Sequence, residues 1–445
     1  MSTTIRPMIK FGTDGIRGTV GSFPITPEAF KCIGQACRCW LLAQNLPLTV
    51  AIGWDTRASG KNLAEAFACG FYNDNSEKIN FLGITPTPAI SFYVQHNSIS
   101  LGVSITASHN PYTDNGLKLF KTSGSKLTRE EEAEIERLCT NQPSTTNVHF
   151  SSYNINGSDY YLQTFKSIYP SNLFASKKIV LDTANGATYY TTLPLLKYLG
   201  LDIIAIGNHP NGININDHCG SEHAEYLKET VKTENAWLGF AHDGDGDRIV
   251  VIDENGEKLN GDELLGLLAI ELKLKNRLTN HTLVVTEQSN SGLINSLKDQ
   301  GIFTQTCSIG DREVFYGLQK FGACFGGESS GHIIFKDEAP TGDGLRVLLK
   351  LLFLAQEKPL CERKRLIHLL PKRESSLIVK EKIPLTQFYH LNKLLSELRS
   401  APGRVYVRYS GTENKLRFLV EADTEKLCEE RMKILKQTAL LDLKQ

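Results

Sequence analysis

The amino-acid sequence predicts an α/β protein made of three related α/β units and a smaller C-terminal α+β module. Three observations support this prediction. Apolar, β-branched runs alternate with helical patterns along most of the 445 residues. One strand–loop–strand pattern occurs three times. The tail instead places strand-like runs beside two long helical patterns. At roughly 150 residues per domain, the length suits three or four domains.

The strand and helix predictions for the main part of the chain follow from hydrophobic periodicity. Thr26 and Pro27 have the form of a helix N-cap followed by proline in the first turn. Strands are predicted at residues 48–52, 178–181, 203–206, 249–252 and 282–285. Helices are predicted at residues 26–43, 63–72, 129–138, 193–199 and 262–272. Strand and helix in alternation favour largely parallel pairing.

The three repeated segments each place a polar loop between two apolar strands. The first has strands at 101–105 and 117–120, the second at 237–241 and 248–252, and the third at 321–325 and 332–335. Their loops read TASHNPYTDNG, HDGDGD and GGESSG. We interpret them as three related units that contribute one functional loop each.

The tail differs from the rest of the chain. Residues 375–385, 404–410 and 414–422 are strand-like, and residues 385–398 and 425–443 are helical. This mixture favours a small α+β module that begins near residues 371–375. The predicted domains are residues 1–152, 153–254, 255–371 and 372–445, which carry one candidate functional loop each.

Composition excludes several classes of protein. Lys and Arg number 49, and Asp and Glu also number 49, so the zero formal net charge argues against a nucleic-acid-binding surface. No run of about 18 apolar residues is present, and the N-terminus has no apolar secretory segment, so we expect no membrane partner. The ten cysteines form no CxxC pair and are expected to be free thiols. We therefore expect a cytoplasmic protein.

The string DGDGDR is the strongest chemical signal. Asp243, Asp245 and Asp247 alternate with glycines, so three carboxylates can point at one hard cation such as Mg²⁺, Ca²⁺ or Mn²⁺. An EF-hand is a poor alternative, because Arg248 occupies the sixth position, where that loop needs glycine, and strand residues follow. A plain acidic turn stays open as the other alternative.

TASHNP places Ser108 in a strand-to-loop turn, where we expect its hydroxyl to stand exposed at the apex. His109 is adjacent, but sequential neighbours rarely face each other, so it is a doubtful base for Ser108. The hydroxyl is therefore either a nucleophile or a turn residue that bonds to its own backbone.

Two further strings carry polar side chains on a flexible backbone. In GGESSGH, Glu328 can accept hydrogen bonds from two neighbouring sugar hydroxyls, although a glycine-rich turn is the simpler explanation. RYSGTENKLR has the parts of a phosphate cradle without P-loop spacing, or alternatively it is a charged surface strand. Its candidate residues are Arg408, Ser410, Gly411 and Thr412. Arg17 and Lys118 add cations that can stabilise a transferring phosphoryl group. Together these parts indicate phosphoryl transfer on a phosphorylated polyol.

On these motifs, the chain resembles the α-D-phosphohexomutases over nearly its whole length. TASHNP, DGDGDR and GESSGH are similar to the family's phosphoserine, metal and sugar loops. Further strings resemble the branch that acts on glucosamine phosphates: FGTDGIRG, DTANGA, NINDHCGS, IGDR and TGDG. The resemblance implies three similar α/β domains with mixed sheets plus a smaller C-terminal α+β domain, heart-shaped around a central cleft.

The resemblance also implies an activity and a role for each candidate residue. The activity is interconversion of glucosamine 6-phosphate and glucosamine 1-phosphate through a phosphoserine and glucosamine 1,6-bisphosphate, on the route to UDP-N-acetylglucosamine and cell-wall precursors. One Mg²⁺ per chain would be bound by phosphorylated Ser108, Asp243, Asp245 and Asp247. Proton transfer and charge stabilisation would fall to Arg17, Lys118, His109 and His332. Substrate would be bound by Glu328, Ser330, Arg408, Ser410, Gly411, Thr412 and Arg417.

The sequence departs from the family pattern at Tyr409, at Asn414–Lys415 and at Glu313. These departures bear on substrate affinity and specificity rather than on the metal or the nucleophile. Three alternatives are a phosphomannomutase or phosphoglucomutase, a non-catalytic phosphosugar-binding protein, and a metal-dependent phosphatase. The expected partner is a small phosphosugar, and the chain is expected to be a monomer or a homodimer.

Overall fold

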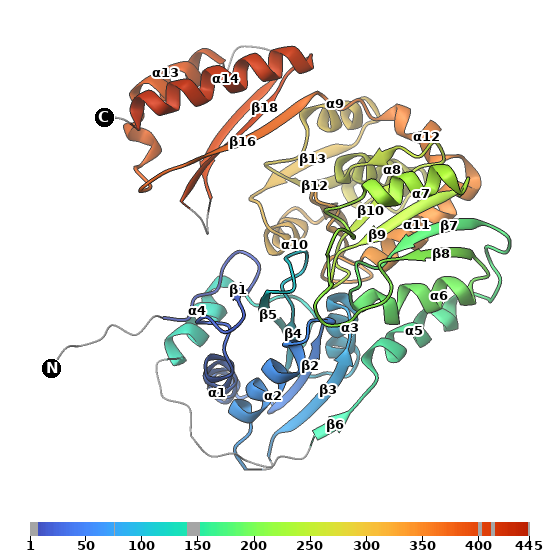
Figure 1. The fold of residues 1–445 in the computed structure, drawn as a ribbon, viewed down its shortest axis with the longest axis vertical. Coiled ribbons are helices and arrows are strands. Elements are labelled where there is room, and N and C mark those ends of the chain that lie inside the picture. Colours follow the sequence, from blue (N-terminus) through green and yellow to red (C-terminus); the bar gives the residue numbers. More distant parts are fainter. Residues whose placement is uncertain (1–7, 75, 140–151, 399–402, 411–413, 444–445) are drawn as a thin grey trace.

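The structure, a computed structural model, describes residues 8–74, 76–139, 152–398, 403–410 and 414–443. It contains four sheets, and the units built on them follow one another along an arc from the N-terminal to the C-terminal unit (Figure 1). None of the helices in these ranges is long and apolar enough to cross a membrane. All ten cysteines are free thiols, as the sequence predicted.

The first sheet has six strands and is mixed. Its order is β1 (Ile16–Thr19), β5 (Asp114–Lys121), β4 (Leu101–Ile105), β2 (Thr49–Trp54), β3 (Lys78–Ile84) and β6 (Ser152–Asn154). β4, β2, β3 and β6 run parallel, whereas β5 is antiparallel to both β4 and β1. One face packs on α1 (Pro27–Ala43), α2 (Gly60–Phe71) and α4 (Arg129–Leu138), and the other on α3 (Thr87–His96). The Thr26 hydroxyl caps α1, as predicted.

The second and third sheets repeat this plan. The second has the order β11 (Lys258–Leu259), β10 (Ile249–Ile252), β9 (Leu238–His242), β7 (Lys178–Asp182) and β8 (Asp202–Ile206). The third has the order β13 (Phe303–Cys307), β12 (Thr282–Thr286), β14 (Phe325–Gly327) and β15 (Ile333–Phe335). In each, an antiparallel strand joins parallel ones, so the predicted mixed sheets are confirmed.

Helices cover both of these sheets. Those of the second unit are α5 (Gly157–Ile168), α6 (Thr192–Tyr198) and α7 (Glu225–Thr233). Those of the third are α8 (Gly261–Leu274), α9 (Ser291–Asp299), α10 (Asp311–Lys320), α11 (Gly344–Glu357) and α12 (Leu360–Arg363). Short 3₁₀ turns lie at Ala187–Tyr190, Thr279–His281, Lys364–Leu366 and Leu385–Gln387.

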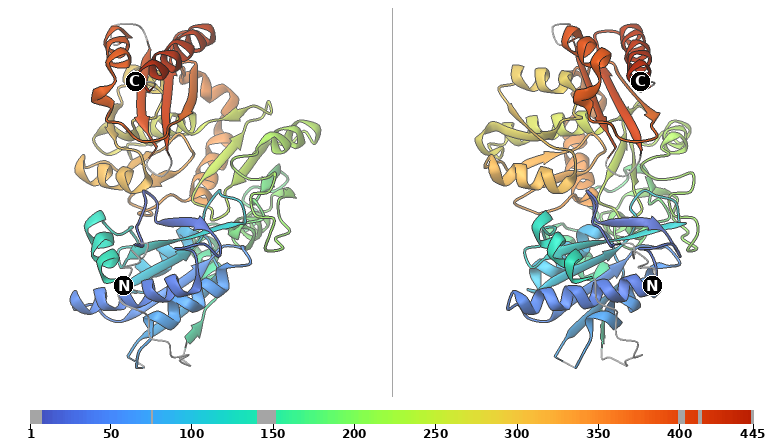
Figure 2. Two further views of the ribbon diagram at one scale, coloured as in Figure 1. Left: turned by 60° about the vertical axis from the view of Figure 1, so that its left-hand side comes forward. Right: turned by 90° about the vertical axis from the view of Figure 1, so that its left-hand side faces the viewer.

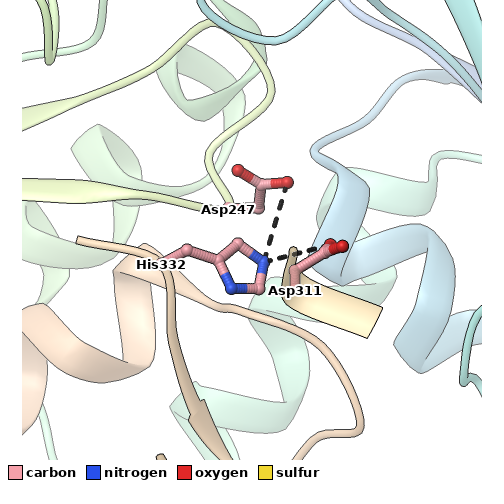
Figure 3. A group of neighbouring side chains, drawn as sticks. All are labelled: Asp247, Asp311 and His332. Atoms are coloured by element: carbon pink, nitrogen blue, oxygen red, sulfur yellow. Dashed lines mark ion pairs between the residues drawn. The ribbon is translucent and has the colours of Figure 1, made fainter. Parts of the chain in front are cut away.

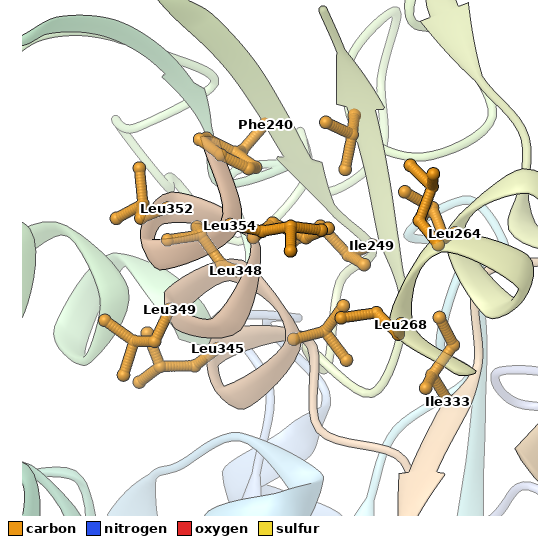
Figure 4. Packing of buried hydrophobic residues seen from close by; sticks show 14 of the residues in the cluster. Phe240, Ile249, Leu264, Leu268, Ile333, Leu345, Leu348, Leu349, Leu352 and Leu354 are labelled. Carbon is orange, nitrogen blue, oxygen red and sulfur yellow. The ribbon is translucent and has the colours of Figure 1, made fainter. Parts of the chain in front are cut away.

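The largest hydrophobic core is shared by the second and third units. Leucines of α11 belong to one cluster with Phe240 and Ile249 of the second sheet, Leu268 of α8 and Ile333 of the third sheet (Figure 4). This shared core holds the two sheets in a fixed relation, because close-packed protein cores resist sliding.

The C-terminal module is the predicted small α+β unit. Its antiparallel sheet has the order β16 (Lys372–Ile378), β18 (Lys415–Glu421) and β17 (Arg404–Tyr409). α13 (Tyr389–Leu398) and α14 (Glu425–Asp442) cover one face, which carries the module's core. Figure 2 shows this module at the opposite end of the molecule from the N-terminal sheet.

Three element predictions miss a boundary by four residues or more. The strand expected at 321–325 is β14, which starts only at Phe325, because Phe321–Cys324 form a turn. The strand expected at 375–385 is β16, which starts at Lys372, pairs with β18 and stops at Ile378. The helix expected at 385–398 is interrupted at Phe388, because Pro384 opens a separate 3₁₀ turn before α13.

Candidate active site

The loop that carries Ser108 joins β4 to β5. Ser108 has φ 53°, a left-handed conformation that is unfavourable for a residue with a Cβ atom, and its side chain is buried. Its Oγ donates to Asp243 Oδ2 at 2.6 Å, across 135 residues of sequence. The prediction of an exposed hydroxyl is therefore wrong, because the loop between β9 and β10 covers it.

A buried polar network supports this loop from beneath. The Ser108 backbone N–H donates to Thr106 Oγ1 at 2.8 Å, and the Thr106 hydroxyl donates to Asp55 Oδ2 at 2.7 Å. Asp55 also accepts from Arg57 Nε at 2.9 Å. Burial raises the pKa of Asp55 more than Arg57 and Thr106 lower it. The sequence offered no signal for Asp55 or Arg57.

The aspartate triplet occupies the loop between β9 and β10. One carboxylate oxygen from each of Asp243, Asp245 and Asp247 lies within 4.8 Å of the others, and all three residues are buried. Burial, with repulsion from Asp247 and Asp245, raises the pKa of Asp243 well above its usual range. Asp245 Oδ1 and Asp247 Oδ1 are buried without a hydrogen-bond partner. Such oxygens fit a hard divalent cation, which would take the place of the missing donors.

Lys118 supplies positive charge beside the triplet. It extends from β5, and its buried Nζ donates to Asp245 Oδ2 at 2.8 Å and to Asp247 Oδ2 at 2.7 Å. Burial lowers its pKa, but Asp14, Asp245 and Asp247 together raise it well above the usual value. Burial raises the pKa of Asp247, but Lys118, His332 and Arg248 together outweigh this, so that the pKa falls to about 2. Lys118 is therefore a cation at neutral pH in this arrangement.

A chain of ion pairs connects the triplet to the third unit. Arg17 of β1 pairs with Asp14 and donates to Ala107 O at 3.2 Å. Lys126 pairs with both Asp14 and Asp311, the latter at the start of α10. Asp14 and Asp311 lie within the strings FGTDGIRG and IGDR, which could have singled them out. Lys126 gave no sequence signal, because nothing local marks a lysine that pairs across domains.

His332 is buried where the second and third sheets meet (Figure 3). Its Nε2 lies 3.5 Å from Asp311 Oδ2 and 3.9 Å from Asp247 Oδ2. Those same oxygens also face Lys126 and Lys118, so we interpret the group as a charge network. The backbone of His332 forms an isolated β-bridge with the backbone of Arg248, which brings the predicted sugar loop against the aspartate loop.

His109 lies at the edge of the site. Its Nδ1 is 3.4 Å from Ser108 Oγ, farther than the Asp243 oxygen that the hydroxyl faces. Burial, together with the nearby guanidinium groups of Arg248 and Arg17, lowers the pKa of His109 to about 4. Its imidazole is therefore neutral at pH 7.

The predicted sugar loop is the turn between β14 and β15. Glu328 is partly exposed and its Oε1 accepts from Gly310 N at 3.1 Å. Burial raises the pKa of Glu328 more than His332 and Arg248 lower it. Ser330 is exposed at the tip of the turn, and Gly331 has the left-handed φ of 86° that closes it. The exposed side of this loop is therefore available to a ligand.

Arg408 and Arg417, two of the predicted phosphate-binding residues, lie on the face of the C-terminal sheet that α13 and α14 leave uncovered. Arg408 and Arg417 are directly opposite each other on β17 and β18, and Ser376 of β16 extends the same row. They line a groove of about 280 Å³ together with Tyr406 and Glu374. Ser410 is buried at the end of β17, and Gly411 and Thr412 lie outside the described residues.

Comparison with known proteins assigns the family. Models of the four phosphoglucomutase/phosphomannomutase domains match the chain in order: α/β/α domains I, II and III at residues 8–146, 159–256 and 260–370, and the C-terminal domain at 395–436. The chain belongs to the phosphoglucomutase/phosphomannomutase family.

Relatives within the family are similar over nearly their whole length. A protein of Helicobacter acinonychis named phosphoglucosamine mutase is 40% identical over 441 residues, which cover 96% of this chain and 98% of that protein. One of Syntrophobacter fumaroxidans with the same name is 38% identical and covers 94% of this chain and 95% of that protein.

Solved structures share the fold. A phosphoglucomutase/phosphomannomutase family protein from Burkholderia thailandensis superimposes with TM-score 0.80 at 21% identity, with 97% of each chain covered. The N-acetylphosphoglucosamine mutase of Aspergillus fumigatus, solved with GlcNAc-6P and magnesium, has TM-score 0.66 at 18% identity, with 98% of this chain and 96% of that one covered. These likenesses confirm the predicted fold class.

Proposed function

We propose that this family member is a phosphoglucosamine mutase, which interconverts glucosamine 6-phosphate and glucosamine 1-phosphate. The observation that carries the proposal is the contact between Ser108 Oγ and Asp243 in a buried centre that also holds Lys118. A hydroxyl beside a cation site and a buried ammonium is the arrangement that phosphoryl transfer needs. The 40%-identical relatives named phosphoglucosamine mutase support the choice of sugar.

In the proposed cycle, Ser108 carries the phosphoryl group in the resting enzyme. Asp243, Asp245 and Asp247, together with this phosphoserine, would bind one Mg²⁺ per chain. When bound, the ion supplies positive charge that neutralises the phosphoryl oxygens. Lys118 and Arg17 add fixed positive charge on the side of the first sheet. The phosphoserine adds about two negative charges, which these cations offset.

The C-terminal groove would hold the phosphate already on the sugar. Arg408 and Arg417 present two guanidinium groups from one row of the sheet, and a planar guanidinium suits paired phosphate oxygens. Ser410, with Gly411 and Thr412, completes the proposed set. Glu328 and Ser330 would orient the ring by its hydroxyl groups. The free sugar hydroxyl then lies in line with the phosphorus, and this positioning supplies much of the rate.

In the transfer step, the bond from phosphorus to Ser108 Oγ breaks as a bond to the sugar oxygen forms. The sugar hydroxyl gives its proton to an imidazole, and Ser108 Oγ takes up a proton from the protonated imidazole, which regenerates the serine hydroxyl. The group that accepts the sugar proton must be neutral before the step, and the lowered pKa of His109 keeps its imidazole neutral. His332 is the second candidate for the proton acceptor. The product is glucosamine 1,6-bisphosphate. It must turn over in the site and return its other phosphoryl group to Ser108, which regenerates the phosphoserine.

Two measurements test this function. Intact mass of the purified protein should show one phosphate, which peptide analysis places on Ser108. Turnover should then be measured on the 6-phosphates of glucosamine, glucose and mannose. We expect the highest kcat/KM on glucosamine 6-phosphate. A higher kcat/KM on a glucose or mannose phosphate would instead favour the phosphoglucomutase or phosphomannomutase activity that the family description names. Release of free phosphate without isomer exchange would contradict the proposal.

A further inference from the structure

The backbone of the serine loop is held by two side chains with no assigned role. Arg57 donates from Nη2 to Ser108 O at 3.1 Å and to Asn110 O at 2.7 Å, and from Nη1 to Asp114 O at 2.9 Å. Asn216 donates from Nδ2 to the same two carbonyls, Ser108 O at 2.8 Å and Asn110 O at 2.9 Å. Two donors from different units thus converge on one short stretch of backbone.

Asn216 reaches this position from the second unit, between β8 and α7. It is buried, and its own φ of 58° is left-handed, a conformation that asparagine tolerates better than most residues. Its backbone N–H donates to Ala184 O at 2.9 Å. Asn216 belongs to the string NINDHCGS and Ala184 to DTANGA, two motifs that the proposed chemistry does not use.

The two motifs brace each other. Asp182 Oδ1 accepts from Ala184 N at 2.8 Å and its Oδ2 accepts from Gly220 N at 2.7 Å. Asn185 Nδ2 donates to Asn214 O at 3.1 Å. The turn that presents Asn216 is therefore tied on both sides to the end of β7. Because these contacts fix Asn216, its amide can restrain the backbone carbonyls of Ser108 and Asn110.

The serine loop needs such support for two reasons. Ser108 is left-handed, so the loop would relax toward a more favourable backbone without restraint. The metal loop also packs against it closely. A Cβ atom at Gly244 would lie 2.7 Å from Ser108 O and 3.0 Å from Asn216 Nδ2. A small shift of the Ser108 carbonyl would therefore displace the hydroxyl relative to the aspartates.

We infer that Asn216 is a positioning residue for the phosphoryl-transfer step, because its amide holds the serine loop in the conformation that aims Ser108 Oγ at the aspartate triplet. The inference rests on the proposed function of Ser108. It gives the NINDHCGS motif a role in positioning the nucleophile Ser108 rather than in binding the sugar. The second unit thus acts on the serine in two ways, through its carboxylates and through the backbone of the loop.

Two variants remove the contact without forcing the backbone. Asn216→Gly deletes the side chain and tolerates φ 58° without strain, and Asn216→Asp keeps the shape but turns a donor into an acceptor facing two carbonyls. The matched control is Asn235→Gly, because Asn235 is also left-handed, with φ 48°, and lies exposed in the same unit.

We expect kcat on glucosamine 6-phosphate to fall about 10- to 100-fold in both Asn216 variants, the cost of a misplaced reacting group, while KM stays within about twofold. The control should match the wild type. Amide hydrogen exchange in the peptide containing residues 106–111 should become faster only in the Asn216 variants, and this readout does not depend on any activity. Absence of turnover in the wild type would contradict the proposed function. The hydrogen-exchange result would still show whether Asn216 restrains the serine loop.

Other outcomes overturn the inference. A kcat within twofold of wild type, or a loss carried entirely by KM, would show that the contact does not position Ser108. Unchanged exchange would show that Asn216 does not restrain the loop. If both Asn216 variants fail to fold while Asn235→Gly folds, Asn216 is a structural residue, and the positioning role is wrong.

Discussion

The serine–aspartate centre and the C-terminal groove are built in opposite ways. In the centre, Ser108 and the three aspartates expose 2% or less of their surface, and residues from the first three sheets contact one another there. In the groove, Arg417 is exposed and Arg408 is half-buried on a sheet that belongs to one module. Charges interact strongly where water is excluded and weakly where it is not. Under the proposed function, the transfer step would take place in the centre, and the groove would bind and release the phosphate of the sugar.

The attachment of the two regions differs as well. The first three units share ion pairs and hydrogen bonds through Lys126, Asp311 and Asn216. In the described residues, the C-terminal sheet meets the third unit through side-chain contacts that include Tyr406 to Glu287, Arg404 to the carbonyls of Glu287 and Ser289, and Ser291 to Glu421. A module held this way can move as one piece, which would let the bisphosphate turn over.

The largest effect should come from removing the nucleophile. Ser108→Ala should reduce mutase turnover by about 10⁴-fold or more, because it removes the proposed phosphoryl carrier; the Thr87 hydroxyl contacts Asp245 rather than Asp243 and does not occupy the place of Ser108. Steady-state assay and intact mass, which should lose the added phosphate, check this. Ser98→Ala is the matched control, since Ser98 is also left-handed but exposed. Normal turnover by Ser108→Ala would show that the reaction does not proceed through a phosphoserine at this position.

Metal removal should have the next largest effect. Treatment with EDTA should reduce kcat at least about 100-fold, and Mg²⁺ should restore it, because the unpartnered oxygens of Asp245 and Asp247 lose their cation. Thermal unfolding should also shift upward as Mg²⁺ is added, since an ion that binds only the folded state stabilises it. Full activity after exhaustive chelation would contradict a metal role for the triplet.

Loss of a groove arginine should act on binding instead. Arg417→Ala should raise KM about 10- to 100-fold and change kcat by less than about fivefold, because it removes one phosphate contact and leaves the centre intact. Arg373→Ala serves as control, since Arg373 lies on the same sheet but pairs with Glu425 and Glu429 of α14. An unchanged KM with a reduced kcat would reverse the roles we assign to the two regions.

Ionic strength should separate the regions without any substitution. Raising salt from about 50 to about 500 mM should increase KM several-fold, because salt screens the exposed Arg417 and the half-buried Arg408 of the groove. The kcat should change by less than about twofold, because the ion pairs of Lys118 are buried. A kcat that fell in parallel with the rise in KM would indicate that the centre opens to solvent during catalysis.

The smallest effect should come from the attachment between the third unit and the C-terminal module. Tyr406→Phe removes the hydrogen bond of 2.7 Å to Glu287 and should lower the free energy of unfolding by about 1 kcal/mol. Denaturant unfolding measures it, and kcat should stay within about twofold. A much larger loss would mean that this hydrogen bond is a main attachment of the module rather than one of several.

Much of the architecture was predictable from local patterns. Alternating apolar strands and helical stretches identified the three α/β units, because the side-chain period of a buried strand or helix is written into the chain. The loops of the candidate site were also predictable, because their polar residues and glycines separate apolar strands. The alternating aspartates and glycines at 243–247 indicate a cation site from the sequence alone. The interruption at Phe388 was missed, because an apolar pattern continues through it.

The sequence by itself determined which elements form, which loops carry chemistry, and that a cation and a phosphate are the expected ligands. Only the tertiary structure decided that Ser108 is buried beneath Asp243, that Lys126 joins Asp14 to Asp311, and that Asn216 holds the serine loop. The reason is physical. Local periodicity records what a residue does within its own helix or strand, whereas a contact across 100 or more residues depends on how separately formed sheets pack together.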